Sequence, residues 1–123
     1  MNRSTRGRRA QVSGIDAEAL ACAALAHDGW TVLGQRLRTA AGEIDVVAER
    51  AGLVAFVEVK QRATLSVAAY ALAPRQRRRL IAAAEILLGE NPAWGLEGVR
   101  FDVLLVDGAG SVRRITDAFR AEC

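Results

Sequence analysis

The chain has 123 residues and a formal net charge of +3; 51% of its residues are hydrophobic and 25% are charged. A chain of this length can bury roughly two-thirds of its unfolded surface in one core, so length and composition indicate one globular domain and exclude disordered and collagen-like chains. No apolar run approaches the roughly 20 residues that cross a bilayer, and no apolar segment follows the basic start as in a signal peptide. We therefore expect a cytoplasmic protein that does not contact the membrane.

The N-terminal segment differs in charge from the rest of the chain. The first 14 residues hold four arginines and no acid, so the remaining residues carry a net charge of −1. The segment also has few apolar residues that could dock, which predicts a basic flexible arm over 1–13 and a single domain over 14–123. A basic arm can follow phosphate groups, although a solvated terminus is the simpler explanation.

A helix and three strands are predicted in the first half of the chain. Residues 14–28 are rich in alanine and other strong helix formers, and Gly29 provides a C-terminal stop. Extended segments follow at 30–38, 43–49 and 53–60. A short turn at residues 50–52 joins the last two segments as a hairpin.

The second half is predicted to hold another helix and two strands. Pro74 fits the first turn of a helix, and apolar residues recur at helical spacing up to Gly89. A long strand is expected at 99–107, an edge strand at 112–116 and a terminal helical turn at 117–122. The element order is α-β-β-β-α-β-β, which we interpret as an α/β fold with a mixed β-sheet flanked by helices.

Three charged side chains stand out because they interrupt apolar strands. The segment 53–60 is apolar on both faces, as in a central strand, so Glu58 and Lys60 are charges at the end of a buried element. Asp45 interrupts the neighbouring apolar run in the same way. The hairpin can bring Asp45 near Glu58 on a shared face, with a register that a bulge would shift by one.

Two interpretations of this group remain open from the residues alone. Facing carboxylates repel each other unless a cation lies between them, and oxygen ligands suit Mg²⁺ rather than zinc. The alternative is a structural ion pair at a strand end. Lys60 favours the metal site, because it is the single lysine among 17 basic residues and a compact ammonium can hold a water molecule.

Several short motifs, taken in order, resemble one known family. They are GEIDVVAE at 42–49, FVEVKQR at 56–62 and RFDV at 100–103, preceded by Glu18 in an alanine-rich helix. The combination spans nearly all of the chain after the arm and is similar to the YraN-like family of small, largely uncharacterised bacterial proteins. That family resembles a minimal member of the PD-(D/E)xK superfamily, with a restriction endonuclease-like fold, and is similar to archaeal Holliday junction resolvases.

The resemblance implies a set of site residues. Asp45 takes the place of the metal-binding aspartate, Glu58 that of the second carboxylate and Lys60 that of the motif lysine. Glu18 matches the helical acid that often completes such sites. Asp45, Glu58 and the backbone carbonyl of Val59 are then expected to hold Mg²⁺ or Mn²⁺, and the likeness to junction resolvases suggests a homodimer.

The second predicted helix departs from the family pattern. The family usually has a lysine that faces the site, whereas this chain has Gln76 in the stretch PRQRRRL. Gln76 shares a helical stripe with apolar residues and is expected to point inward, with Arg77 beside it. Glu43, on the same strand face as Asp45, is a candidate supporting residue behind the ligands. The candidates for contact with nucleic acid are Arg62, Arg75, Gln76, Arg77 and Arg79.

These features lead to three hypotheses about function. The first is a Mg²⁺-dependent endonuclease that hydrolyses phosphodiester bonds in DNA, with branched DNA as a candidate substrate. The second is a non-catalytic module that binds nucleic acid, which Gln76 favours because it brings no charge. The third is an interaction protein whose arginines bind an acidic protein partner.

Overall fold

A computed structural model of the chain describes residues 14–63, 65 and 72–119. The elements follow the predicted order α-β-β-β-α-β-β, and the arm expected at 1–13 lies outside the described residues. None of the helices in these ranges has the length and apolar character needed to cross a membrane. The bounds are α2 (Gly14–His27), β1 (Thr31–Thr39), β2 (Gly42–Arg50), β3 (Leu53–Gln61), α3 (Pro74–Glu90), β4 (Gly98–Val106) and β5 (Val112–Phe119).

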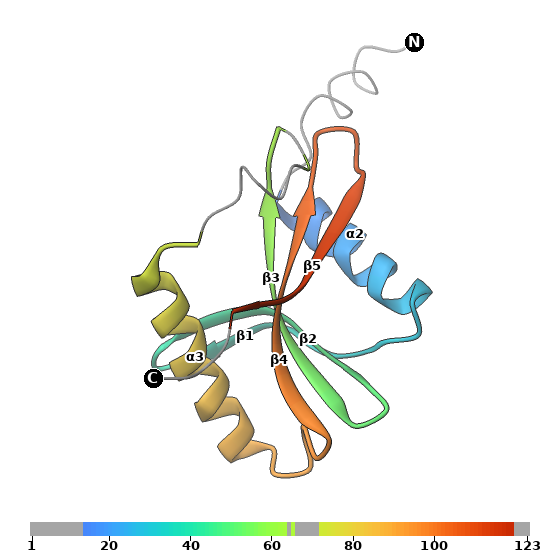
Figure 1. The fold of residues 1–123 in the computed structure, drawn as a ribbon. Helices are drawn as coiled ribbons and strands as arrows, with labels where there is room; N and C mark the ends of the chain where they lie inside the picture. The colour runs from blue at the N-terminus through green and yellow to red at the C-terminus, as the bar shows by residue number, and fades with distance from the viewer. Residues whose placement is uncertain (1–13, 64, 66–71, 120–123) are drawn as a thin grey trace.

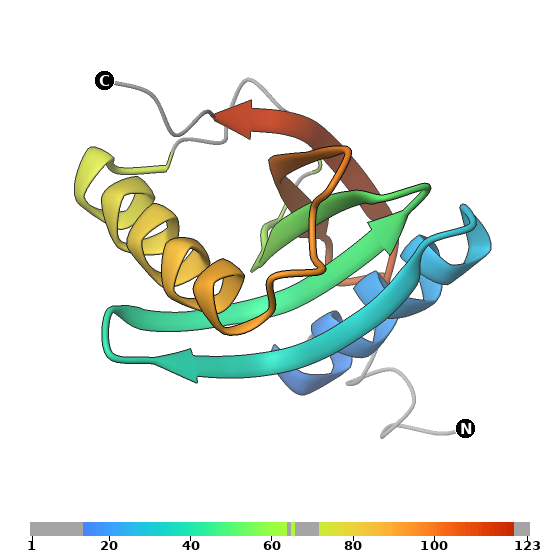
Figure 2. The same ribbon diagram turned by 90° about the horizontal axis from the view of Figure 1, so that it is seen from below.

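The five strands form one mixed sheet, as predicted. Their spatial order is β1-β2-β3-β4-β5, so every strand lies beside its neighbour in the sequence. All pairs are antiparallel except β3 and β4, which are parallel and are connected through α3. The sheet is strongly twisted, and α2 and α3 lie on its opposite faces (Figures 1 and 2).

The two faces of the sheet each pack against one helix. Strand alternation sends successive residues to opposite sides, so β3 places Val54 and Phe56 towards α3 and Ala55 and Val57 towards α2. A strand that is apolar on both faces is buried on both faces, which explains the continuous run of hydrophobic residues in β3. The core on the α3 side includes Ile44, Val47, Leu80, Ala84, Leu87 and Phe101, and that on the α2 side includes Ala21, Leu25, Trp30, Val46, Ala48 and Leu104.

The helix ends confirm one predicted stop and correct the other. Gly29 follows α2 with φ +87°, and the N–H of Trp30 donates to Leu25 O at 2.9 Å, which is a glycine-terminated C-cap. Gly89 was expected to end the second helix, but α3 continues to Glu90. A single helical glycine costs only about 1 kcal/mol relative to alanine, and the backbone N–H of Asn91 closes the helix on Leu88 O.

The predicted helical turn at 117–122 is wrong for the residues that the structure describes. Strand β5 extends to Phe119, whose backbone pairs with Phe101 on β4. The two rings stack with centroids 4.8 Å apart, so aromatic packing across the strands holds this segment in the extended state. A bulge lies just before it, where Asp117 has a φ of +54°.

Candidate functional site

The candidate site lies where β2 and β3 separate. A tight turn at Ala51 and Gly52, with φ of +53° and +82°, sets the hairpin register and pairs Val46 with Val57. One residue further from the turn, Asp45 would lie opposite Glu58, and there the backbone pairing stops. The Asp45 carboxylate takes over the role of a strand partner, because its Oδ2 accepts the backbone N–H of Val59 at 2.8 Å. The predicted approach of Asp45 to Glu58 is therefore present, and Val59 contacts Asp45 through its amide.

Glu58 is the most densely contacted side chain of this site. It is only 8% exposed, although it is a carboxylate. Its Oε2 accepts hydrogen bonds from Lys60 Nζ at 3.0 Å and from Gln76 Nε2 at 2.9 Å, and the Asp45 carboxyl group lies close enough to raise its pKa. Burial is the largest cause that raises the pKa of Glu58, and the charge of Asp45 raises this pKa further, while Lys60 lowers it.

Glu18 on α2 approaches Asp45. The pKa of its carboxyl group is raised, first by burial and then by the charge of Asp45, while Arg36 lowers it. Arg36 Nε donates to Glu18 Oε1 at 3.2 Å. Glu18 thus lies close enough to Asp45 for their charges to interact, and its hydrogen-bond partner is Arg36 on β1. Its role in the site stays a prediction.

Arg36 was not among the predicted site residues. It falls between the pairs Gln35–Val46 and Leu37–Ile44, and therefore opposite Asp45 on β2. Its φ of +52° is in the left-handed region, which is unfavourable for a side chain with a Cβ. In the β1–β2 hairpin, the arginines at positions 36 and 38 lie across from the acids at 45 and 43. This charge pattern could have identified Arg36 only if the pairing register of the two strands had been known.

Glu43 lies at the margin of the site. Its side chain is exposed, and Arg38 Nε is 3.5 Å from its Oε2. Its charge still contributes to raising the pKa of Glu18. Glu43 therefore lies near Glu18, and its supporting role behind metal ligands stays a prediction.

The candidates for contact with nucleic acid differ in where they lie relative to the site. Gln76 points inward and touches Glu58, and Arg77 beside it is half-buried. Arg75 and Arg79 are exposed, and the stem of Arg79 passes so close to the β1–β2 turn that a Cβ at Gly42 would lie 3.0 Å from Arg79 Cγ. Arg62 is exposed just after β3, and its Nη1 binds the neighbouring carbonyl of Gln61 at 2.7 Å.

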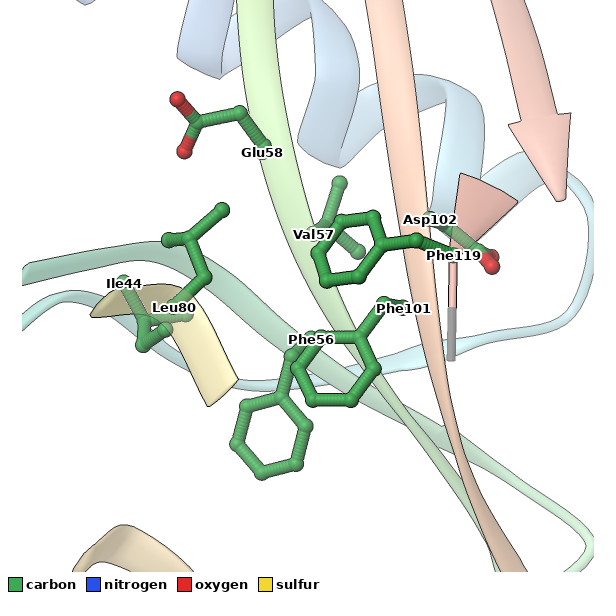
Figure 3. A pocket seen from close by; sticks show the side chains of 8 residues that line it. All are labelled: Ile44, Phe56, Val57, Glu58, Leu80, Phe101, Asp102 and Phe119. Carbon is green, nitrogen blue, oxygen red and sulfur yellow. The ribbon is translucent and has the colours of Figure 1, made fainter. Parts of the chain in front are cut away.

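An apolar hollow borders Glu58 on the α3 side of the sheet (Figure 3). The rings of Phe56, Phe101 and Phe119 form a stacked series along it, with centroid distances of 5.8 and 4.8 Å. The carboxylate of Glu58 points away from these rings, so the hollow insulates one side of the acid from water without offering it a polar partner. Burial favours the neutral form of the acid, and it is the first cause that raises the Glu58 pKa.

The donor set can be compared with what a metal ion requires. The described residues include no group of three or more His, Cys, Asp or Glu side chains close enough together to hold a metal on their own. Magnesium needs fewer protein ligands, because it commonly binds one or two carboxylates and completes its coordination shell with waters and substrate phosphate oxygens. Asp45 and Glu58 supply two carboxylates in contact and no nitrogen or sulfur, which fits Mg²⁺ or Mn²⁺.

Comparisons with known proteins agree with the resemblance noted in the sequence. Residues 17–106 match the family described as Uncharacterised protein family UPF0102. A UPF0102 protein of Granulibacter bethesdensis is 62% identical over 95% of this chain and 74% of its own length. Relatives from Acidiphilium cryptum (54% identical; 98% of this chain and 93% of theirs) and Rhodopseudomonas palustris (44%; 89% and 84%) carry the same family name. The chain belongs to the uncharacterised protein family UPF0102, the YraN-like family.

Proposed function

We propose that this protein is a Mg²⁺-dependent endonuclease that hydrolyses phosphodiester bonds in DNA. The observation that carries the proposal is the contact between the Asp45 and Glu58 carboxyl groups, with the Lys60 ammonium 3.0 Å from Glu58 Oε2. A structural ion pair needs one acid and one base, whereas here a second acid, Asp45, lies beside the pair of Glu58 and Lys60. An additional cation would relieve the repulsion between the two acids.

The residues divide the chemistry among them. Asp45 and Glu58 would hold the divalent cation, with the Val59 backbone, which already anchors Asp45, next to them. Bound there, the cation would act as a Lewis acid towards the scissile phosphate. Lys60, partly exposed and on the same strand face as Glu58, can hold a water molecule beside the phosphate and offset developing negative charge.

The resemblance to PD-(D/E)xK nucleases supports the same assignment of Asp45, Glu58 and Lys60. It also suggests branched DNA as the substrate and a homodimer as the active form. We further propose the cytoplasm as the location. The exposed arginines of α3 and the strand-end Arg62 are the residues we expect to contact the phosphate backbone.

One observation favours the second candidate function, a module that binds nucleic acid without cutting it. Gln76 Nε2 donates a hydrogen bond to Glu58 Oε2 at 2.9 Å, and Lys60 contacts the same oxygen. A neutral amide at this point adds no positive charge for a phosphate, so binding could persist while hydrolysis is weak. Substitution Gln76→Lys separates the two functions, because a gain of cleavage would identify a site limited by this residue.

The decisive substitution is Lys60→Arg. If Lys60 positions the attacking water, the larger planar guanidinium should lower Mg²⁺-dependent cleavage by about 100-fold or more while DNA binding is kept. If Lys60 only neutralises Glu58, arginine should serve nearly as well. The measurement is single-turnover cleavage of labelled branched, flapped and single-stranded DNA with Mg²⁺ or Mn²⁺.

Arg113→Lys, on the exposed side of β5, is the matched control for exchanging one basic residue for another. Equal cleavage by the wild type and Lys60→Arg would exclude the water-positioning role. Absence of cleavage by the wild type on every substrate, together with salt-dependent DNA binding, would favour the binding module over the endonuclease.

A further inference from the structure

A second group of charged side chains lies on the α2 face of the sheet, around Trp30. The guanidinium carbons of Arg50, Arg100 and Arg114 lie 5.1, 5.2 and 5.5 Å from the centre of the Trp30 ring. They come from β2, β4 and β5, so the sheet brings together three arginines that are far apart in the sequence. We call Trp30 and these three arginines the Trp30 cluster.

The charges of the Trp30 cluster are only partly balanced by the contacts seen. Asp102 forms a two-pronged ion pair with Arg100, at 2.9 Å for each of the two hydrogen bonds. Arg50 Nη1 donates to the backbone carbonyl of Asp28 at 2.9 Å, which brings no charge. Cation–π contacts help to hold guanidinium groups near an indole, but they do not cancel the repulsion among three cations.

Two hydrogen-bond donors in the cluster are buried and have no acceptor among the residues that the structure describes. These are the indole Nε1 of Trp30 and Nη1 of Arg114. Trp30 is only 3% exposed, so water does not freely reach its N–H. A buried donor without a partner costs about 1–3 kcal/mol, more when the group is charged, and such groups are rare in native proteins. Donors of this kind indicate an acceptor that residues 14–63, 65 and 72–119 do not supply.

We propose that the Trp30 cluster binds an oxyanion of the phosphate type. A phosphate group has several acceptor oxygens and negative charge, so it can meet guanidinium forks and an indole N–H together. Arg50 is exposed and opens the cluster to solvent, while Trp30 and the Nη1 of Arg114 form its buried end. This site is on the opposite face of the sheet from Glu58, and it does not depend on the proposed nuclease activity.

The test uses the fluorescence of Trp30 in the otherwise intact chain. The other tryptophan, Trp94, is replaced by phenylalanine so that Trp30 alone reports. Inorganic phosphate is titrated at constant ionic strength against chloride, and thermal melting is recorded in parallel. We expect phosphate, but not chloride, to change the Trp30 emission in a saturable way and to raise the melting temperature.

Variants assign the effect to the cluster. Arg114→Gln should weaken phosphate binding at least about tenfold, because it removes one charge-assisted hydrogen bond. Arg113→Gln is the matched control, because it removes the same charge from an exposed neighbour that alternation places on the other face of β5. Arg50→Gln, at an exposed position, gives the same test if Arg114→Gln does not fold.

The source of the phosphate is resolved by a further arm of the experiment. A short oligonucleotide with a 5′-phosphate is compared with the same oligonucleotide bearing a 5′-hydroxyl. Tighter binding of the 5′-phosphorylated oligonucleotide identifies a nucleic-acid terminus as the ligand. If both oligonucleotides bind equally weakly while inorganic phosphate binds strongly, the ligand is a free anion. Identical responses to phosphate and chloride, or equal phosphate affinity in Arg114→Gln and Arg113→Gln, would overturn the proposal and leave a structural cluster hydrated by water.

Discussion

Two buried carboxylates on neighbouring strands have opposite environments. Asp102 on β4 is 1% exposed, and Arg100 and the backbone N–H of Asp117 satisfy it with hydrogen bonds of 2.8–2.9 Å. Glu58 on β3 is 8% exposed, and it shares its surroundings with a second acid, Asp45. The first carboxylate is matched by a permanent cation, while the second faces a lysine, an amide and another carboxylate.

The difference separates a structural acid from a candidate functional one. A buried charge that is fully paired contributes to a defined structure, and its removal leaves its partners unsatisfied. A buried charge beside a like charge lowers stability and is typical of sites that bind cations or transfer protons. Substitution of the two acids should therefore have opposite effects on folding.

The largest effect is expected for Asp102→Asn. Loss of the charge would leave Arg100 half-buried without its partner, which should lower the free energy of unfolding by about 3 kcal/mol. In a domain of this size that corresponds to a melting temperature lower by roughly 10 °C. Thermal and urea denaturation of the wild type and the variant measure the change.

The double substitution Arg100→Met with Asp102→Leu checks the cause. Replacement of both charges by apolar groups should cost less than Asp102→Asn alone, because no charge is left unpaired. A double variant that is less stable than Asp102→Asn would show that the bond from the Asp117 amide, rather than the ion pair, dominates.

The opposite result is expected for Glu58→Gln. The pKa of Glu58 is raised in the folded protein, so its ionisation lowers stability as the pH rises from the ordinary glutamate pKa of about 4.3 through the raised folded value. Glutamine cannot ionise. The variant should therefore be as stable as the wild type or more so at pH 7, with a smaller advantage at pH 4, while losing cleavage.

Calorimetric titration of Mn²⁺ into the same variant completes this comparison. The wild type should release or absorb binding heat that Glu58→Gln lacks, and Mn²⁺ should raise the melting temperature of the wild type only. Glu85→Gln, an exposed acid on α3, is the matched control and should behave as the wild type. Equal heats from the wild type and Glu58→Gln would remove the metal from the site.

The smallest effect is expected for Arg36→Asn. Asparagine tolerates the left-handed φ of +52° better than arginine does, so relief of strain and loss of the Glu18 ion pair nearly offset each other. The free energy of unfolding should change by less than about 1 kcal/mol. A larger loss would show that the Arg36–Glu18 contact holds α2 against the sheet.

Much of this site was predictable from periodicity. The alternation of β3 placed Glu58 and Lys60 on one face, and the hairpin brought Asp45 towards them. The inward direction of Gln76 followed from its helical stripe. These are local relations that chain geometry alone determines.

The remaining contacts required the tertiary structure. Because the β2–β3 pairing ends at Val46, the Asp45 side chain accepts the hydrogen bond of the Val59 amide. No periodic pattern in the sequence indicates where two strands separate. The partnership of Arg36 with Glu18 joins β1 to α2, and it depends on the register of a different hairpin.

The sequence by itself determined the order of elements, the two-sided burial of β3 and the family, because these depend on hydrophobic periodicity and on motifs that are contiguous in the chain. Only the tertiary structure decided which charges meet across the sheet. It placed Asp45 against Glu58 and gathered Arg50, Arg100 and Arg114 around Trp30. Side chains from strands that pair non-locally become neighbours only when the register is fixed, and a shift of one residue would have reversed the face of each.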